Sequence, residues 1–238
     1  MICFLTSRMD DPVTGELNPA NGFVEQLRSC FPEPCRALFI CSDPEAWETT
    51  DYYAAVSKGY FEKEGFQTER FRVLDGRNAA QAAQLLRQSN LIVLAGGHVP
   101  TQNRFFREIG LRELMQGYDG AVIGISAGSM NSADIVYAQP EEEGEAIDPG
   151  YERFLTGLNL TKTMLLPHYQ EVKNELLDGL RVFEDITYSD SVGKCFYAIP
   201  DGSYLLVEAG RETLRGEAYR IEDGRIEQIS RHGEAVTL

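Results

Sequence analysis

Short apolar runs alternate with segments of helical periodicity over the first half of the chain. Phe23, Leu27 and Phe31 recur at helical spacing, as do Tyr52, Val56 and Tyr60. Runs that are apolar throughout and are separated by helices indicate a parallel sheet covered on both faces. We therefore predict an α/β fold with a doubly wound, mostly parallel sheet flanked by helices. The predicted strands are Ile2–Thr6, Ala37–Cys41, Phe66–Leu74, Leu91–Ala95 and Ala121–Ile125.

The pattern changes after the fifth apolar run. Thr161–Leu166 predicts one more strand, and the spacing of Val172, Leu176, Leu180 and Phe183 predicts an amphipathic helix. Asp201-Gly202 and Asp223-Gly224 each lie between two apolar runs, which predicts two β-hairpins. Because no linker separates these hairpins from the rest, we expect a single domain over 1–238. It would have an α/β core over 1–190 and a C-terminal antiparallel, hairpin-rich appendage over 191–238.

Charge and composition limit the kinds of partner molecule that we expect. The chain has 22 Lys and Arg against 37 Asp and Glu, a formal net charge of −15. Such a chain repels nucleic-acid phosphates and anionic lipid, so we expect neither nucleic acid nor membrane as a partner. No apolar run approaches the length of a membrane helix or a signal peptide. The five cysteines and three histidines lack the spacing of a metal site, so we expect a cytoplasmic protein without metal or cofactor.

The clearest chemical motif is Gly124-Ile125-Ser126-Ala127-Gly128, at the end of the fifth apolar run. This is the G-x-S-x-G pattern of a nucleophile elbow, in which a strained strand-to-helix turn exposes the serine hydroxyl. Small flanking residues let the neighbouring backbone approach the turn closely. Ser126 is therefore the candidate nucleophile. The alternative is an ordinary strand-to-helix turn in which Ser126 caps the helix.

A serine nucleophile needs a base, and the histidines are few. His168 follows an apolar strand and Pro167, so we expect it at the same edge of the sheet as Ser126. His232 lies in a polar tail and is expected to be solvated. His98 follows the pair Gly96-Gly97, and it is a candidate to contact substrate or to order the loop.

Backbone amides are the candidate oxyanion donors. The N–H of Gly97, together with that of Ala127, would form a two-donor oxyanion hole. The competing interpretation of Gly96-Gly97 is a simple turn that introduces a helix. The acid of a triad would come from the carboxylates between Ser126 and His168, and composition does not choose among them. These are Asp134, Glu141, Glu142, Glu143, Glu145 and Asp148.

Three segments resemble the dipeptidase E and cyanophycinase family of serine peptidases. They are Ala95-Gly96-Gly97, the run from Ile123 to Ser129, and Leu166-Pro167-His168-Tyr169. The resemblance implies a fold similar to class I glutamine amidotransferases, with Ser126 as nucleophile and His168 as base. It also implies that the Gly97 and Ala127 amides form the oxyanion hole. The family's acid position downstream of the serine falls on Glu141, with Glu142 or Glu143 as neighbouring choices, and so implies a Ser-His-Glu triad.

The chain departs from the family at two places. Gly97 is followed by His98-Val99-Pro100-Thr101, where the family commonly has Gly-Gly-Asn-Thr. The Gly-Glu-Thr-Arg segment of aspartyl dipeptidases, whose arginine holds the substrate carboxylate, is missing after His168. Arg181 lies at a comparable distance but within a helical pattern. A preference for Asp-X substrates is therefore not implied.

The leading prediction is a serine hydrolase that cleaves small peptides through an acyl-enzyme, without a cofactor. An α/β-hydrolase-type esterase shares the motif and the order Ser, acid, His. However, the 42 residues from Ser126 to His168 leave little room for its additional strand–helix units. The third hypothesis is a non-catalytic, amidotransferase-like binding domain. The amidotransferase elbow needs a cysteine nucleophile, and none of the five cysteines takes that position. The apolar C-terminal hairpins would permit a homodimer contact.

Overall fold

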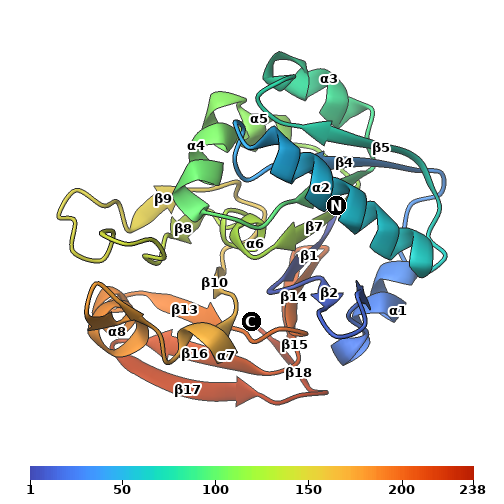
Figure 1. Cartoon of the computed structure of the whole chain (residues 1–238). Helices are drawn as coiled ribbons and strands as arrows, with labels where there is room; N and C mark the ends of the chain where they lie inside the picture. The colour runs from blue at the N-terminus through green and yellow to red at the C-terminus, as the bar shows by residue number, and fades with distance from the viewer.

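A mixed sheet of eight strands forms the centre of the protein in the computed structural model, which describes residues 1–238 (Figure 1). Its strand order is β18-β15-β14-β1-β7-β6-β4-β5. Five consecutive strands of this sheet, β1-β7-β6-β4-β5, pair in parallel, as predicted. Their bounds are β1 (Ile2–Thr6), β7 (Ala121–Ile125), β6 (Leu91–Leu94), β4 (Cys35–Ile40) and β5 (Thr68–Leu74).

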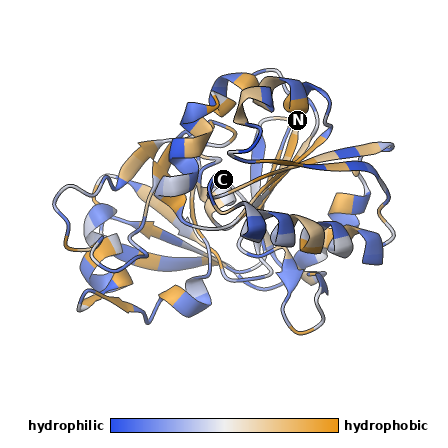
Figure 2. Ribbon diagram, turned by 45° about the horizontal axis from the view of Figure 1, so that its top comes forward, coloured by the Kyte–Doolittle hydropathy of each residue, from blue (hydrophilic) through white to orange (hydrophobic).

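Helices cover both faces of the parallel strands. Phe4 and Phe39 point to one face, where they pack in the same core as Phe61. Leu5 and Leu38, the neighbours in sequence, point to the other face and pack with the second set of helices. The first face carries α1 (Phe23–Arg28) and α2 (Trp47–Lys63), and the second carries α3 (Ala82–Arg87), α4 (Val99–Glu108) and α5 (Leu111–Leu114). Burial on both faces explains why the inner strands β1, β7 and β6 are almost wholly apolar, whereas the edge strand β5 carries charged residues (Figure 2).

The C-terminal strands contribute to two sheets instead of forming an appendage. A second sheet has the order β10-β13-β16-β17, and three further strands extend the central sheet beside β1. The hairpin predicted around Asp223-Gly224 is confirmed as β16–β17. The hairpin predicted around Asp201-Gly202 is wrong, because β13 pairs in the second sheet while β14 pairs with β1 in the first. The bounds are β10 (Met164–Leu166), β13 (Cys195–Ala198), β16 (Ala218–Glu222), β17 (Arg225–Ser230), β14 (Tyr204–Glu208), β15 (Arg211–Arg215) and β18 (Ala235–Thr237).

The long helix predicted from Val172 to Phe183 is also wrong. A short helix, α7 (Tyr169–Val172), is followed by the small hairpin of β11 (Leu176–Leu177) and β12 (Leu180–Arg181). Asp178 and Gly179 form its turn with φ angles of 54° and 82°, which a helix does not admit. The π-helical segment η3 (Val182–Thr187) and α8 (Tyr188–Asp190) complete the region.

Several short elements connect the two sheets and their helices. These elements are β2 (Asp10–Asp11), β3 (Glu16–Leu17), η1 (Ala20–Gly22), η2 (Ala79–Gln81), α6 (Ala127–Met130), β8 (Ile135–Tyr137) and β9 (Phe154–Thr156).

No helix of the protein is long and apolar enough to cross a lipid bilayer.

Candidate active site

The carboxyl ends of three neighbouring strands meet at one edge of the central sheet. Ser7 follows β1, Ser126 follows β7 and Gly96-Gly97 follows β6. The N–H of Ser126 donates a hydrogen bond to the carbonyl oxygen of Thr6 at 3.1 Å, which ties the strand end to its neighbour. This edge is where open α/β sheets bind their ligands.

Ser126 lies on the strained turn that the sequence predicts. Its φ and ψ are 49° and −112°, outside the regions that a residue with a side chain ordinarily adopts. Gly128 packs directly under β6, where a Cβ would clash with the carbonyl oxygen of Leu94. The following helix α6 is a single turn. Its contribution to the site is therefore the individual N–H groups at its start, and not a long helix dipole.

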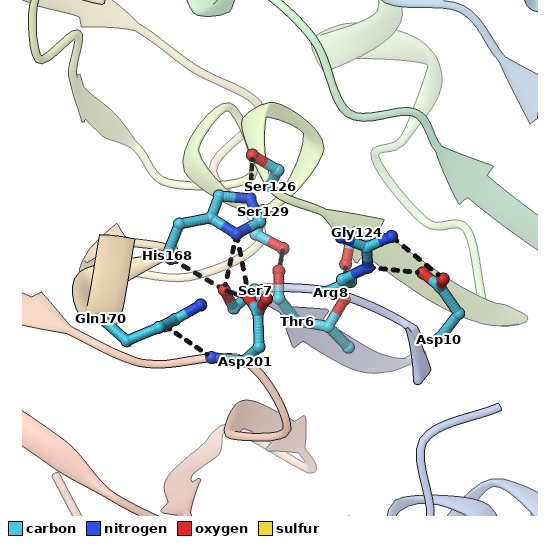
Figure 3. Close-up of polar contacts among 10 residues, drawn as sticks. All are labelled: Thr6, Ser7, Arg8, Asp10, Gly124, Ser126, Ser129, His168, Gln170 and Asp201. Atoms are coloured by element: carbon cyan, nitrogen blue, oxygen red, sulfur yellow. Dashed lines mark hydrogen bonds and ion pairs between the residues drawn. The ribbon is translucent and has the colours of Figure 1, made fainter. Parts of the chain in front are cut away.

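His168 reaches Ser126 from the second sheet. It follows β10 and Pro167, and its Nε2 lies 3.0 Å from the Oγ of Ser126 (Figure 3). The backbone of His168 is itself left-handed, with φ 56°. Its N–H donates to the Oγ of Ser7 at 2.8 Å, which holds the turn against the end of β1. The structure thus brings together the two residues that the sequence singles out as nucleophile and base.

Asp201 is the carboxylate beside His168. Its Oδ1 lies 2.9 Å from Nδ1 of His168. Because a carboxylate only accepts, Nδ1 carries the proton and Nε2 is left to accept from the Ser126 hydroxyl. Burial alone would raise the pKa of Asp201, but hydrogen bonds from His168 and Ser7 and the nearby charges hold that pKa below its ordinary value. Asp201 therefore stays ionised.

Ser7 connects the two halves of this arrangement. Its hydroxyl donates to Oδ1 of Asp201 at 2.6 Å and accepts from the N–H of His168. Ser7 is fully buried, so water does not compete for these bonds. Ser7 is not among the site residues predicted from the sequence. The signal was present, because Ser7 directly follows a predicted parallel strand and so had to lie at the same edge as Ser126.

Glu141 does not contact His168, which corrects the triad acid that the resemblance implied. Its Oε1 accepts the N–H of Val99 at 2.9 Å and so caps the first turn of α4. Although Glu141 is exposed as a residue, partial desolvation of its carboxylate against the start of α4 raises its pKa, and the bond from Val99 opposes this. The loop between β8 and β9 is folded onto the start of α4, and this carries its carboxylates away from the imidazole.

The other candidate acids are also placed elsewhere. Asp134 pairs with Arg112 and Lys162, at 2.7 and 2.6 Å. Glu142 and Glu143 are exposed. No hydrogen bond joins any of them to His168.

Both ring nitrogens of His98 are held by hydrogen bonds within the protein. Its Nε2 lies 2.8 Å from Oε1 of Glu145, and its Nδ1 lies 2.8 Å from Oγ1 of Thr101. Burial alone would raise the pKa of Glu145. Hydrogen bonds from the N–H groups of Glu141 and Glu142 and from His98 outweigh it and lower that pKa. These contacts fit the second of the two roles considered for His98, ordering of the loop, and a contact with substrate stays a prediction.

The same cluster is the one grouping of potential metal ligands. Donor atoms of His98, Glu142 and Glu145 lie within 4.8 Å of one another. The hydrogen bonds just described already account for both ring nitrogens of His98 and both oxygens of Glu145. The arrangement therefore needs no ion to explain it.

Two backbone N–H groups beside Ser126 have no acceptor in the protein. They belong to Gly97 and Ala127, the two residues predicted to form an oxyanion hole. Gly97 has a φ of 150°, and a Cβ there would clash with the side chain of Ser42. Gly96 packs against Ser126, and a Cβ added to Gly96 would lie only 3.4 Å from the Cβ of the serine. The loop after β6 thus approaches the nucleophile as closely as its glycines allow.

A cleft of about 610 Å³ opens over these residues. Its floor includes Ser7, Gly97, Ser126 and His168, and one wall is helix α2. The cleft residues of that wall are Thr49, Thr50, Tyr52, Tyr53, Val56, Ser57 and Tyr60.

A serine on a strained elbow, with an imidazole and a buried carboxylate aligned behind it, is the arrangement of a serine hydrolase. The sequence model of peptidase family S51 matches residues 12–214. The chain belongs to peptidase family S51 and is a serine peptidase. This confirms the family resemblance and the enzyme class expected from the sequence.

Solved structures support the fold. A peptidase from an acI-B1 Actinobacterium is 16% identical, with a TM-score of 0.66, over 100% of this chain and 96% of that one. A protein from Listeria monocytogenes EGD-e, described as a proposed peptidase E, is 17% identical, with a TM-score of 0.57, over 96% of this chain and 98% of that one. No curated protein matches the chain in sequence.

Proposed function

We propose that the protein hydrolyses small peptides through a Ser126-His168-Asp201 triad. The observation that carries this proposal is one continuous chain of hydrogen bonds. It runs from the Ser126 hydroxyl to Nε2 of His168 at 3.0 Å, and from Nδ1 to Asp201 at 2.9 Å.

In the first half of the reaction Ser126 attacks the scissile carbonyl carbon. Its proton passes to Nε2 of His168, and the ionised Asp201 stabilises the resulting imidazolium. The carbonyl oxygen becomes an oxyanion, and the free N–H groups of Gly97 and Ala127 are the donors available to it. His168 then gives the proton to the leaving amine, the C–N bond breaks, and an acyl-enzyme remains.

In the second half a water molecule takes the place of the amine. His168 accepts a proton from the water as it attacks the acyl carbon, and the same two N–H groups receive the oxyanion. Collapse breaks the ester bond to Ser126, releases the carboxylic acid and returns the proton to the serine oxygen. No step requires a group from outside the chain other than water.

The dimensions of the cleft support a small substrate. A volume of about 610 Å³ is within the range of small-molecule sites. Helix α2 lines the same cleft as the nucleophile, and this walled setting favours a short peptide over a folded protein. Cleavage at the size of a dipeptide, a cytoplasmic location and a homodimer remain predictions.

The experiment that tests this function compares wild type with Ser126→Ala on a dipeptide and tripeptide library, alongside p-nitrophenyl esters. We expect peptide cleavage by wild type and its loss in Ser126→Ala. A fluorophosphonate probe should label wild type on Ser126 and leave the variant unlabelled. Ester turnover without peptide cleavage would favour the esterase instead, and peptide cleavage retained by Ser126→Ala would exclude the mechanism.

A further inference from the structure

Helix α2 leaves Tyr52 and Tyr53 exposed, whereas its Phe61 is buried in the core. Tyr52, Val56 and Tyr60 recur at helical spacing, and such a stripe usually faces the interior. The residues of α2 that are buried in the structure are instead Thr50, Ala54, Ser57 and Phe61. Three of these four are small, so apart from Phe61 the helix packs on the sheet with small side chains, and Tyr52 and Tyr53 lie outside the core.

The outward stripe lines the cleft that contains Ser126. Tyr52, Tyr53, Val56 and Tyr60 all contribute to its wall. Tyr52 is 64% exposed and Tyr53 is 56% exposed. Their rings meet edge to face, with centroids 5.3 Å apart and an interplanar angle of 73°. Large rings left open to water beside a nucleophile are typical of a surface that a ligand covers.

The charges of the cleft are already paired or are negative. Arg8 lines the cleft, but its guanidinium forms a two-point ion pair with Asp10, at 3.1 and 3.3 Å. The hydroxyl of Tyr60 donates to the same carboxylate at 3.2 Å. Asp43 also lines the cleft, where its carboxylate accepts the N–H of Glu45 and pairs with no cation. An acidic substrate side chain would therefore meet net negative charge, whereas an uncharged ring or a branched aliphatic chain would meet tyrosine faces.

We propose that the α2 wall, defined as Tyr52, Tyr53, Val56 and Tyr60, selects peptides with an aromatic or large aliphatic side chain next to the scissile bond. This inference rests on the proposed function, because it names the substrate class of the same site. The gain comes from apolar area that both the substrate side chain and the exposed tyrosine rings remove from water. The wall lies on one side of the nucleophile, so the preference belongs to one side of the bond only.

The test uses two dipeptide series, one varied on the acyl side and one on the amine side of the bond. Each series carries Phe, Leu, Ala, Asp or Lys at the varied position. For wild type we expect kcat/KM in one series to be about tenfold higher for Phe and Leu than for Ala, and lowest for Asp. In the double variant Tyr52→Ala, Tyr53→Ala the ratio of Phe to Ala should fall toward one.

Trp47→Ala is the matched control. Trp47 is an aromatic residue of the same helix, is 46% exposed and does not line the cleft. It should keep the wild-type ratio of Phe to Ala. Circular dichroism and the oligomeric state of all three proteins should agree, because the substituted rings are not part of the core.

The outcomes separate this inference from the proposed function. If wild type cleaves no peptide and the probe does not label Ser126, both are wrong. If wild type cleaves peptides but prefers Asp or Lys, or shows no side-chain preference, only the aromatic wall is wrong. The same holds if the double variant lowers kcat/KM equally for every peptide, if Trp47→Ala changes the ratio as much as the double variant does, or if removing the two tyrosines changes the oligomeric state.

Discussion

The carboxylate of Asp201 lies 2.9 Å from Nδ1 of His168, although 33 positions separate the two residues in sequence. Both stand at the junction of the two sheets. His168 follows β10, and Asp201 follows β13, the parallel neighbour of β10 in the second sheet. The N–H of Tyr169 donates to the carbonyl of Ile199 at 3.2 Å, so the two loops run side by side as they leave that sheet. The pairing of β10 and β13 therefore brings base and acid together.

This relationship predicts different effects for the two carboxylates that compete for the role of acid. Asp201→Asn leaves an amide that no longer stabilises the imidazolium, and we expect kcat to fall by about a thousandfold or more. Glu141→Gln keeps an oxygen for the N–H of Val99 and is far from the imidazole, so kcat should fall by less than about tenfold. Steady-state kinetics on one peptide would check both. A larger loss in Glu141→Gln than in Asp201→Asn would contradict the assignment.

Ser7 is predicted to be a positioning residue for His168 and Asp201. Ser7→Ala removes the acceptor of the His168 N–H and a donor to Asp201, so kcat should fall by about tenfold or more while KM changes little. Ser191→Ala is a matched control, because the buried Ser191 hydroxyl also accepts one backbone N–H, from Gly224, and donates to one oxygen, of Tyr188.

We expect both serine variants to lose about 1 kcal/mol or more of unfolding free energy. Only Ser7→Ala should lose activity beyond what that destabilisation explains. Equal kinetics in the two variants would assign Ser7 a purely structural role.

Gly97 is predicted to tolerate no side chain. In Gly97→Ala the new Cβ meets Ser42, and the φ of 150° is strained for alanine, so the loop and its N–H must move. Loss of one oxyanion donor reduces kcat by about a hundredfold or more. Ser42→Gly in the same protein removes the clash but not the strain, and it should restore part of the activity. Near-wild-type turnover by Gly97→Ala would show that its N–H is not used.

Asp201 and Glu141 are predicted to have opposite effects on stability as the pH changes. The pKa of Asp201 is lowered in the folded protein, so its ionised form stabilises the fold. This contribution to the free energy of unfolding is present above the unfolded pKa of about 3.9, and it is lost as the pH falls through the lower folded value. The pKa of Glu141 is raised, so the folded state binds the proton more tightly. The contribution of Glu141 to the free energy of unfolding therefore falls as the pH rises from the unfolded pKa of about 4.3 through the higher folded value.

Denaturant unfolding of wild type, Asp201→Asn and Glu141→Gln between about pH 3 and 7 would measure both effects. The stability difference between wild type and Asp201→Asn should increase with pH. The difference between wild type and Glu141→Gln should decrease. A common sign for the two would mean that one of these environments is wrongly described.

The inner parallel strands and two of the three residues of the proposed triad could be predicted because they depend on local patterns. The inner parallel strands are buried on both faces, which makes them almost continuously apolar and easy to locate. Ser126 and His168 each follow such a strand. Asp201 could not be found in this way, because Asp-Gly between two apolar runs is the usual signal of a hairpin turn. Here the runs belong to different sheets, and the turn delivers a carboxylate to the imidazole.

Helical periodicity located α2 but did not reveal which side is buried. Tyr52, Val56 and Tyr60 predict a helix, and the helix is present. Periodicity shows that one face is apolar, and it does not distinguish a core from a cleft. Likewise, the spacing from Val172 to Phe183 resembles a helix because four apolar residues coincide with it. The turn at Asp178 and Gly179 decides otherwise.

The passage of the chain from β13 to β14 has a consequence for the protein during its synthesis. A ribosome that has released only the first 190 residues has delivered the elbow and the imidazole but not the carboxylate at position 201. It has also not delivered β13, which holds the loop of the imidazole. A nascent chain of that length carries a serine without its full activation. Activation of the serine in the proposed triad therefore waits until synthesis has passed position 201.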